Sequence, residues 1–442
     1  MLQADKLKDF RQAAYQHLTR AKDATFELTD AILLTRHAYC LADLSLSPVF
    51  RRAWPSIYEA LQDSRPQRHK LMRLYIEQIP TDIRPILAGD HTNWSRPEAV
   101  TLKERTIEHQ ATAVYGNRPI TIGQGYSTIA WIPETEGTWA LPLRHERITS
   151  WESPIDKAVW QLKQVCKYLP TRPISLWDSE YGCAPFIIKT ANIPADKLIR
   201  LRSNLCLWTA PPPYCGKGRP RLHGQKFKLN DTTTWTTAIE TVELESPQLG
   251  QLRISLWKDL HFQASPHQPM QLIRVEKLEP SYSWKMPKPL WLVWLGEQMP
   301  PLAEIWQLYL RRFGVDHWYR LAKQRLHWTL PKLSTPKQCE RWSDLMPMIT
   351  WELWLAREIV KDRPLPWQKL LTQLTPGRVA QAMPGVLAAI GTPASSPKTR
   401  GKSPGWPEGQ QRAPRIRYPV VKKGVSRTKK PKGKLAFFSL KS

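Results

Sequence analysis

The sequence predicts an α/β protein in which a helical N-terminal region precedes a mixed sheet. Three observations support this class. Apolar residues recur at helical spacing through residues 1–80, and short β-rich runs separated by turn residues occupy 83–150. A capped helical segment at 153–168 is then followed by another apolar run at 174–178. The hydrophobic content of 41% is enough for a sizeable core.

The N-terminal region, residues 1–82, is expected to be helical. Leu7, Phe10, Ala14 and Leu18 follow helical spacing, and a further helical stretch from residue 55 to 79 is interrupted by a proline. The charge of the region is mixed, and no helix-turn-helix signature stands out. Two interpretations therefore stay open: a helical DNA-binding domain, or a unit for packing or dimerisation.

The next region, residues 83–205, is expected to begin with strands joined by short turns. The first is a short strand from Ile83 to Asp90. Two more runs, 119–122 and 126–132, are separated by glycine-containing turn material, and a further run covers 138–143. This pattern predicts an antiparallel meander.

A helix and another strand follow the meander. Ser153 can cap the helix and Pro154 suits its first turn, and the strand runs from Ile174 to Asp178. Several strands, a helix and then a strand is the order of an RNase H-like core. In that layout the first and fourth strands are neighbours, so Asp90 and Asp178 are expected to lie side by side.

The rest of the chain is expected to divide into three parts. We expect a β-rich insertion over residues 206–288. Over 289–391 we expect the last strand of the core followed by helices, including one long helix over 301–328. Residues 392–442 lose periodicity and predict a disordered basic tail.

The charge of the chain favours a polyanionic partner. The formal net charge is +27, and residues 397–442 hold 14 lysines and arginines against one acid, Glu408. DNA is preferred over an anionic membrane, because no apolar run approaches the roughly 20 residues of a membrane-spanning helix. The N-terminus lacks a signal-peptide apolar region, so we expect a cytoplasmic protein. The six cysteines lack zinc-ligand or disulfide-framework spacing and are expected to be buried free thiols.

A basic loop inside the expected insertion is a second candidate for DNA contact. Arg219 and Arg221 lie in a Gly-Arg-Pro-Arg segment, which resembles the extended hooks that place arginine side chains in a narrow minor groove. The motif is short, and an exposed basic loop without this role is an equal alternative.

Three acids are the candidate catalytic residues. Asp90 and Asp178 follow apolar, strand-like runs, and Asp316 lies in a helical segment rich in basic and aromatic residues. Carboxylates are hard oxygen ligands that suit Mg²⁺ or Mn²⁺. Two such ions about 4 Å apart can activate a water or a 3′-hydroxyl and stabilise the leaving oxygen of a phosphodiester. We therefore expect Asp90, Asp178 and Asp316 to bind two divalent ions.

The helical segment around the third acid has a distinctive face. Tyr309, Arg312, Asp316 and Lys323 fall at i, i+3, i+7 and i+14, which places all four close to one face of an α-helix. This pattern would let Asp316 bind metal while the two cations hold flanking phosphates. The alternative is an ordinary charged helix face.

Here the chain resembles the DDE transposases of bacterial insertion sequences, in the cut-and-paste group marked by Tyr-x2-Arg-x3-Glu-x6-Lys. Tyr309, Arg312 and Lys323 match that spacing, and the segments around Asp90 and Asp178 resemble the first and second acid blocks. The resemblance covers roughly residues 5–360. It implies an RNase H-like fold, cleavage of transposon ends, joining to target DNA, a dimer assembled on the terminal inverted repeats, and DNA contacts through Tyr309, Arg312 and Lys323.

One departure from that group concerns the third acid. The group usually has Glu where this chain has Asp316, whose carboxylate reaches about 1 Å less far. Glu180 and Glu304 are fallback acids that fit the spacing less well. An active transposase is the leading expectation, with a location on the bacterial nucleoid. A catalytically degenerate DNA-binding descendant and a structure-specific nuclease are the alternatives.

Overall fold

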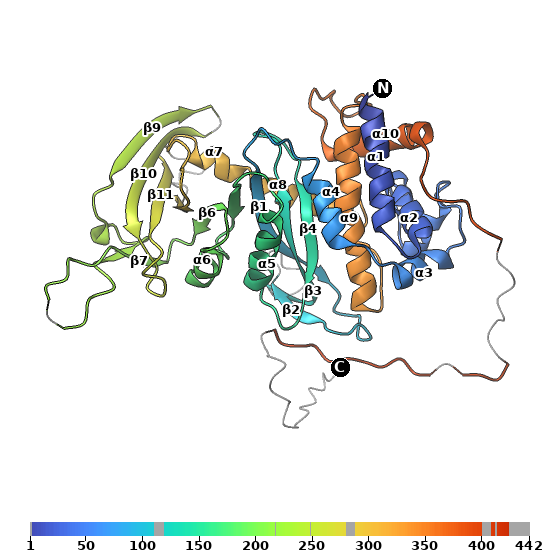
Figure 1. Ribbon diagram of the computed structural model, residues 1–442, viewed down its shortest axis with the longest axis horizontal. Coiled ribbons are helices and arrows are strands. Elements are labelled where there is room, and N and C mark those ends of the chain that lie inside the picture. Colours follow the sequence, from blue (N-terminus) through green and yellow to red (C-terminus); the bar gives the residue numbers. More distant parts are fainter. Residues whose placement is uncertain are drawn as a thin grey trace.

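The computed structural model describes residues 2–109, 119–216, 218–247, 249–279, 288–399, 408–411 and 413–423. It is a mixed α/β structure dominated by one large sheet (Figure 1). Within the described residues, no helix combines the length and apolar character needed to cross a bilayer. All six cysteines are free thiols, but Cys40 and Cys215 are exposed, where the sequence predicted buried thiols.

The N-terminal region is helical, as its periodicity predicted. Its helices pack against the long C-terminal helix α9 (Pro336–Ala356), and the buried guanidinium of Arg11 joins three helices by pairing with Asp30 and Glu352. This observation shows a packing role for the region, whereas DNA binding by it stays a prediction. The helices are α1 (Leu2–His17), α2 (Lys22–Leu34), the 3-10 helix η1 (Leu41–Leu46), α3 (Pro55–Asp63) and α4 (Arg68–Ile76).

The sheet contains ten strands. Nine follow the order β2-β3-β1-β5-β6-β12-β11-β10-β9, and β4 pairs with β3. The strands are β1 (Ile86–Ser95), β2 (Thr106–His109), β3 (Ile120–Trp131), β4 (Leu141–Ile148), β5 (Ile174–Trp177), β6 (Asp196–Leu201), β9 (Glu240–Ser246), β10 (Gly250–Leu260), β11 (Met270–Lys277) and β12 (Leu290–Leu295).

The strand that carries the first acid is longer than the sequence predicted. The expected strand ended at Asp90, but β1 continues to Ser95 because each residue from Leu87 onward pairs with β3. The two runs expected on either side of a glycine turn are one continuous strand, β3. Gly123 and Gly125 lie inside this strand. A Cβ at Gly123 would meet the backbone of Trp94, and a Cβ at Gly125 would meet the side chain of Glu108, so both positions suit glycine.

The neighbouring strand has the predicted partner. β1 and β5 are adjacent and parallel, with Gly89 opposite Trp177, so Asp90 in the middle of β1 lies beside the end of β5, which Asp178 directly follows. Helix α5 (Pro154–Cys166) connects the meander to β5, and the Ser153 hydroxyl caps it by accepting a hydrogen bond from the Asp156 amide, as predicted. Gln161 of α5 bonds to β3, which places this helix on one face of the sheet.

The strands expected to form an insertion extend the same sheet. β12 pairs with β6 on one side and with β11 on the other, so β9, β10 and β11 continue the core sheet outward (Figure 1). Helix α6 (Ala184–Thr190) precedes β6, and η2 (Thr232–Thr234) precedes β9. Only β7 (Cys206–Trp208) and β8 (Lys226–Lys228), of the described strands, form a separate two-stranded sheet.

The predicted long helix over 301–328 is broken in two. α7 (Ile305–Leu310) ends before α8 (Phe313–Gln324) begins, and the Arg312 amide bonds to the Tyr309 carbonyl in a tight i to i+3 turn. The helical spacing of Tyr309, Arg312, Asp316 and Lys323 therefore does not place them on one face of a single straight helix. α9 and α10 (Pro376–Ile390) follow.

Part of the predicted disordered tail is ordered. Residues 413–423 lie along the edge of β2, where the Tyr418 and Val421 amides bond to carbonyls of the Val100–Arg105 segment. The prediction of disorder from residue 392 is wrong for this stretch, because its backbone finds partners at an open strand edge. Residues 424–442 lie outside the described part of the chain.

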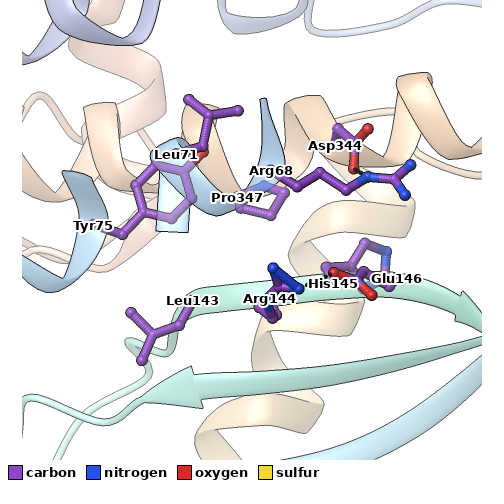
Figure 2. Close-up of a pocket in the computed structure, with 9 residues that line it drawn as sticks. All are labelled: Arg68, Leu71, Tyr75, Leu143, Arg144, His145, Glu146, Asp344 and Pro347. Carbon is purple, nitrogen blue, oxygen red and sulfur yellow. Dashed lines mark hydrogen bonds and ion pairs between the residues drawn. The ribbon is translucent and has the colours of Figure 1, made fainter. Parts of the chain in front are cut away.

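A small cavity lies where the N-terminal helices meet the sheet (Figure 2). It has a volume of about 20 Å³, room for about one water, and is lined from α4, β4 and α9. The Arg68 guanidinium Nε lies 2.7 Å from Asp344 Oδ1, and the Arg144 guanidinium lies 2.7 Å from Glu146. The first pair joins α4 to α9, and the second lies within β4.

Candidate active site

Asp90 lies in the middle of β1 and faces helix α8. Its Oδ2 accepts a hydrogen bond from the Arg312 guanidinium at 3.2 Å, and its Oδ1 accepts one from the His91 amide at 2.7 Å. Burial raises the pKa of Asp90 to about 7; Arg312 opposes this shift, and the charges of Asp316 and Asp178 add to it. The carboxyl thus titrates near neutral pH under the influence of two further acids.

Asp316 reaches the same place from α8. Its Oδ2 lies 3.2 Å from the Arg312 guanidinium, which therefore bridges Asp90 and Asp316. The Asp316 side chain is 44% exposed, against 14% for Asp90. The pair therefore opens to solvent on the side of α8.

Asp178 follows the last residue of β5, as predicted from the apolar run before it. Its Oδ1 accepts a hydrogen bond from the Ser179 amide. Its negative charge contributes to raising the pKa values of Asp90 and Tyr309, so it lies within electrostatic reach of both. The parallel pairing of β1 and β5 is the reason, since it sets Gly89 of β1 opposite Trp177, the last residue of β5.

A hydrogen-bonded chain fixes β1 behind the acids. The Tyr319 hydroxyl donates to the Asp90 carbonyl at 3.0 Å and lies 2.9 Å from the Thr128 hydroxyl, which in turn contacts His145 Nδ1 at 2.8 Å. Farther along, the Lys323 ammonium donates to the Thr92 hydroxyl at 2.7 Å. These contacts position α8 against β1, and sequence reasoning did not identify Tyr319, Thr128 or His145.

His91 points to the opposite face from Asp90, as strand alternation requires. Its Nδ1 lies 3.1 Å from the Tyr181 hydroxyl, and its Nε2 lies 3.2 Å from Glu180. Burial lowers the pKa of His91, with Glu180 opposing the shift and Lys423 adding to it. The fallback acid Glu180 is therefore a partner of His91 on this other face, while Glu304 precedes α7.

The predicted DNA-contact residues do not lie together at the surface. Tyr309 is 1% exposed, and burial raises its pKa to about 12. Arg312 is 5% exposed and engaged with the acids, because the helix break turns it inward. Arg219 and Arg221 are exposed on the loop between β7 and β8. For Tyr309, Arg312 and Lys323, DNA contact stays a prediction that requires the side chains to become accessible.

The donor set suits a divalent cation, although its present arrangement is not a formed metal centre. Carboxylates are the ligands that Mg²⁺ and Mn²⁺ prefer, and Asp90, Asp178 and Asp316 supply three of them. Among the described residues, no three His, Cys, Asp or Glu side chains are arranged to hold a metal ion. A cation between Asp90 and Asp316 would replace the Arg312 guanidinium there.

Two buried polar atoms beside the acids are compatible with such a rearrangement. The Tyr309 hydroxyl and Arg312 Nε lack a hydrogen-bond partner within the described structure. Buried polar groups are rarely left in this state. A ligand that draws Arg312 away from the acids could therefore satisfy groups that are unpaired in the present arrangement.

Acids from two adjacent parallel strands and a packed helix define the class of the protein: an α/β nuclease-like fold with a carboxylate site. The chain belongs to the DDE superfamily endonuclease family, whose family model matches residues 13–261. That match contains Asp90 and Asp178 and ends before Asp316, so the third acid rests on the structure alone. No curated protein matches the sequence.

Proposed function

We propose that the protein is a DNA transposase that cleaves transposon ends and joins them to target DNA by phosphodiester hydrolysis and transesterification. The observation that carries this proposal is the Arg312 bridge between Asp90 of β1 and Asp316 of α8, with Asp178 within electrostatic reach of Asp90. Membership of an endonuclease family supports the hydrolytic step. The net charge of +27 supports DNA as the substrate.

The three acids would hold Mg²⁺ or Mn²⁺, two ions in all. Such ions supply Lewis-acid activation of the attacking oxygen and stabilisation of the leaving oxygen. Asp90 must release its proton to become a ligand, because its pKa is about 7 in the structure. Arg312, once displaced from the acids, would remain close enough to bind a phosphate of the DNA.

The protein's other residues would keep the acids in place. Tyr319 holds the backbone of β1 at Asp90, and Lys323 holds β1 at Thr92, so α8 is attached to β1 at two points. Such fixed placement reduces the reorganisation needed during the reaction. We further propose that two protomers assemble on the terminal inverted repeats, and that the protein acts on the bacterial nucleoid.

A catalytically degenerate DNA-binding protein is the second candidate. The observation that favours it is the Arg312 guanidinium, which occupies the space between Asp90 and Asp316. The shorter carboxylate of Asp316, where relatives of the resembled group carry Glu, points in the same direction. In this case the protein would bind transposon ends without cutting them.

The test uses a duplex that carries the inverted repeats flanking the coding region, incubated with the full-length protein and Mg²⁺ or Mn²⁺. We expect cleavage at the repeat end and strand transfer into a target plasmid, both abolished by EDTA. Asp178→Asn should lose both products and still bind DNA. Asp231→Asn, the same change at a half-buried acid that caps η2, should retain them.

Each alternative has its own result in this experiment. End binding without cleavage under either metal supports the degenerate protein. Cleavage that ignores the repeats supports a structure-specific nuclease. Equal activity of Asp178→Asn and the unmodified protein would show that this acid has no catalytic role.

A further inference from the structure

A pocket of about 720 Å³ lies where the start of α9 meets the chain between β1 and β2 and the C-terminal segment 413–423. Three exposed cations line it, each from a different one of these parts of the chain. They are Lys103 before β2, Lys337 at the start of α9 and Arg415 of the C-terminal segment. The fold therefore gathers in one pocket three cations that lie far apart in the sequence.

The acids of this pocket do not neutralise its exposed cations. Glu104 and Glu340 both pair with the guanidinium of Arg147, at 3.1 Å and 2.7 Å. Within the described part of the chain, the three exposed cations have no carboxylate partner of their own. Like charges held close together repel one another, so an anion that enters the pocket would be bound favourably.

Two aromatic rings border the same pocket. Trp151, which follows β4, is 45% exposed, and Tyr418 lies on the C-terminal segment, where the Lys103 ammonium is 6.0 Å from the centre of its ring. Cations interleaved with accessible rings are the combination that binds single-stranded nucleic acid, because cations pair with phosphates and rings stack on bases. An acidic peptide would pair with the cations but would leave the rings without a role.

The pocket and the candidate active site lie on the same face of the sheet. Arg147 of β4 pairs with Tyr126 of β3, which pairs with Thr92 of β1. Side chains opposite one another on paired strands share a face, and Thr92 shares it with Asp90, two residues away. With strands about 4.8 Å apart, the backbones of Arg147 and Asp90 are about 12 Å apart. Trp328 packs against Tyr126 on this face, so the pocket is separate from the acids.

We propose that this pocket binds an unpaired strand of DNA. Lys103, Lys337 and Arg415 pair with its phosphates, and Trp151 stacks on one of its bases. A duplex offers phosphates but keeps its bases inside the stack, so the exposed ring favours a single strand over a double one. The identity of the ligand as DNA rests on the proposed function, to which the pocket adds a second binding surface outside the three acids.

Two double substitutions test the cations at equal total charge. Lys103→Gln with Lys337→Gln removes two cations of the pocket, whereas Lys6→Gln with Lys8→Gln removes two exposed cations of α1. The measurement is the dissociation constant for a fluorescent strand of thymidines in EDTA, over a series of salt concentrations. We expect roughly tenfold weaker binding by the pocket variant and a salt slope lower by up to about 1.4, since each single-strand contact contributes about 0.7. The α1 variant should change binding less than about twofold, because charges distant from the ligand are screened.

Trp151→Leu tests the stacking contact. We expect it to weaken single-strand binding roughly five- to tenfold and to change duplex binding less than about twofold. Trp367→Leu, the same change at a ring that is 77% exposed outside the pocket, should alter neither. Photocrosslinking of the unmodified protein to a strand that carries 5-bromouracil should attach it to Trp151 or Tyr418, and this readout requires no substitution.

The outcomes separate the pocket from the proposed function. Equal losses by both lysine variants would overturn the pocket assignment, because total charge alone would then explain binding. Crosslinks that avoid both rings, or equal losses of duplex and single-strand binding in Trp151→Leu, would overturn it as well. Neither result affects the proposed function if the unmodified protein still cleaves repeat ends with metal. Single-strand binding as expected without any cleavage under Mg²⁺ or Mn²⁺ would contradict the proposed function and leave the pocket assignment intact.

Discussion

Asp344→Asn tests the buried ion pair that joins α4 to α9 (Figure 2). Asp344 Oδ1 pairs with Arg68 at 2.7 Å, while Oδ2 is buried without a hydrogen-bond partner in the described structure. Burial raises the pKa of Asp344 from 3.8 to about 6; Arg68 opposes this shift, and the carboxylates of Glu146 and Glu340 add to it. The folded state therefore retains this proton at pH values where the unfolded chain has lost it.

The sign and size of the effect follow from proton linkage. Because the folded pKa lies above the unfolded one, the free energy of unfolding falls as pH rises from about 4 to about 6. With these two pKa values, Asp344 costs the native state about 2 kcal/mol more at pH 7 than at pH 4.5. Asn does not titrate, so the stability of Asp344→Asn relative to the unmodified protein should rise by that amount across the same interval.

Urea unfolding followed by tryptophan fluorescence at pH 4.5, 5.5 and 7 measures the difference. Glu297→Gln, which removes a carboxylate whose side chain is 73% exposed, controls for loss of one negative charge. A stability difference between Asp344→Asn and the unmodified protein that stays constant with pH would refute the reasoning. It would show that the carboxyl titrates alike in the folded and unfolded chains.

Three further predictions concern the candidate site. Gly89→Ala should destabilise the protein by about 1–3 kcal/mol in denaturation, because its methyl group would enter the Trp177 ring, whereas Gly377→Ala has open space and should cost less than about 0.5 kcal/mol. Asp178→Asn should reduce cleavage at least about 100-fold in a gel assay while the DNA dissociation constant changes less than about twofold. Lys323→Met should free one end of α8 from β1 and lower the cleavage rate about tenfold, with unchanged activity as the contrary result.

Local sequence signals were sufficient for much of the fold. Ser153 and Pro154 predicted the start of α5, and the apolar runs before Asp178 and at 290–295 predicted β5 and β12. These features depend on hydrogen bonds and periodicity within a few residues. They could be predicted because neighbouring side chains and the local backbone are enough to specify them.

The glycines of β3 show where local signals fail. Gly123 and Gly125 resemble turn material in the sequence, yet both lie within β3. Glycine suits these positions because Trp94 and Glu108 approach them from other strands. The Tyr309 to Lys323 spacing suggested one helix face, but the turn at Arg312 interrupts it. The first error arose where partners distant in the sequence approach the backbone, and the second where a local turn divides the helical segment.

The sequence by itself determined which acids are candidates, because a carboxylate after an apolar run is visible in a few adjacent residues. Only the tertiary structure decided that Arg312 lies between Asp90 and Asp316, and that Lys423 pairs with Glu108. The physical reason is the same in both cases. Burial makes an unpaired charge costly, so each buried charge finds a partner through chain crossings that no local pattern encodes.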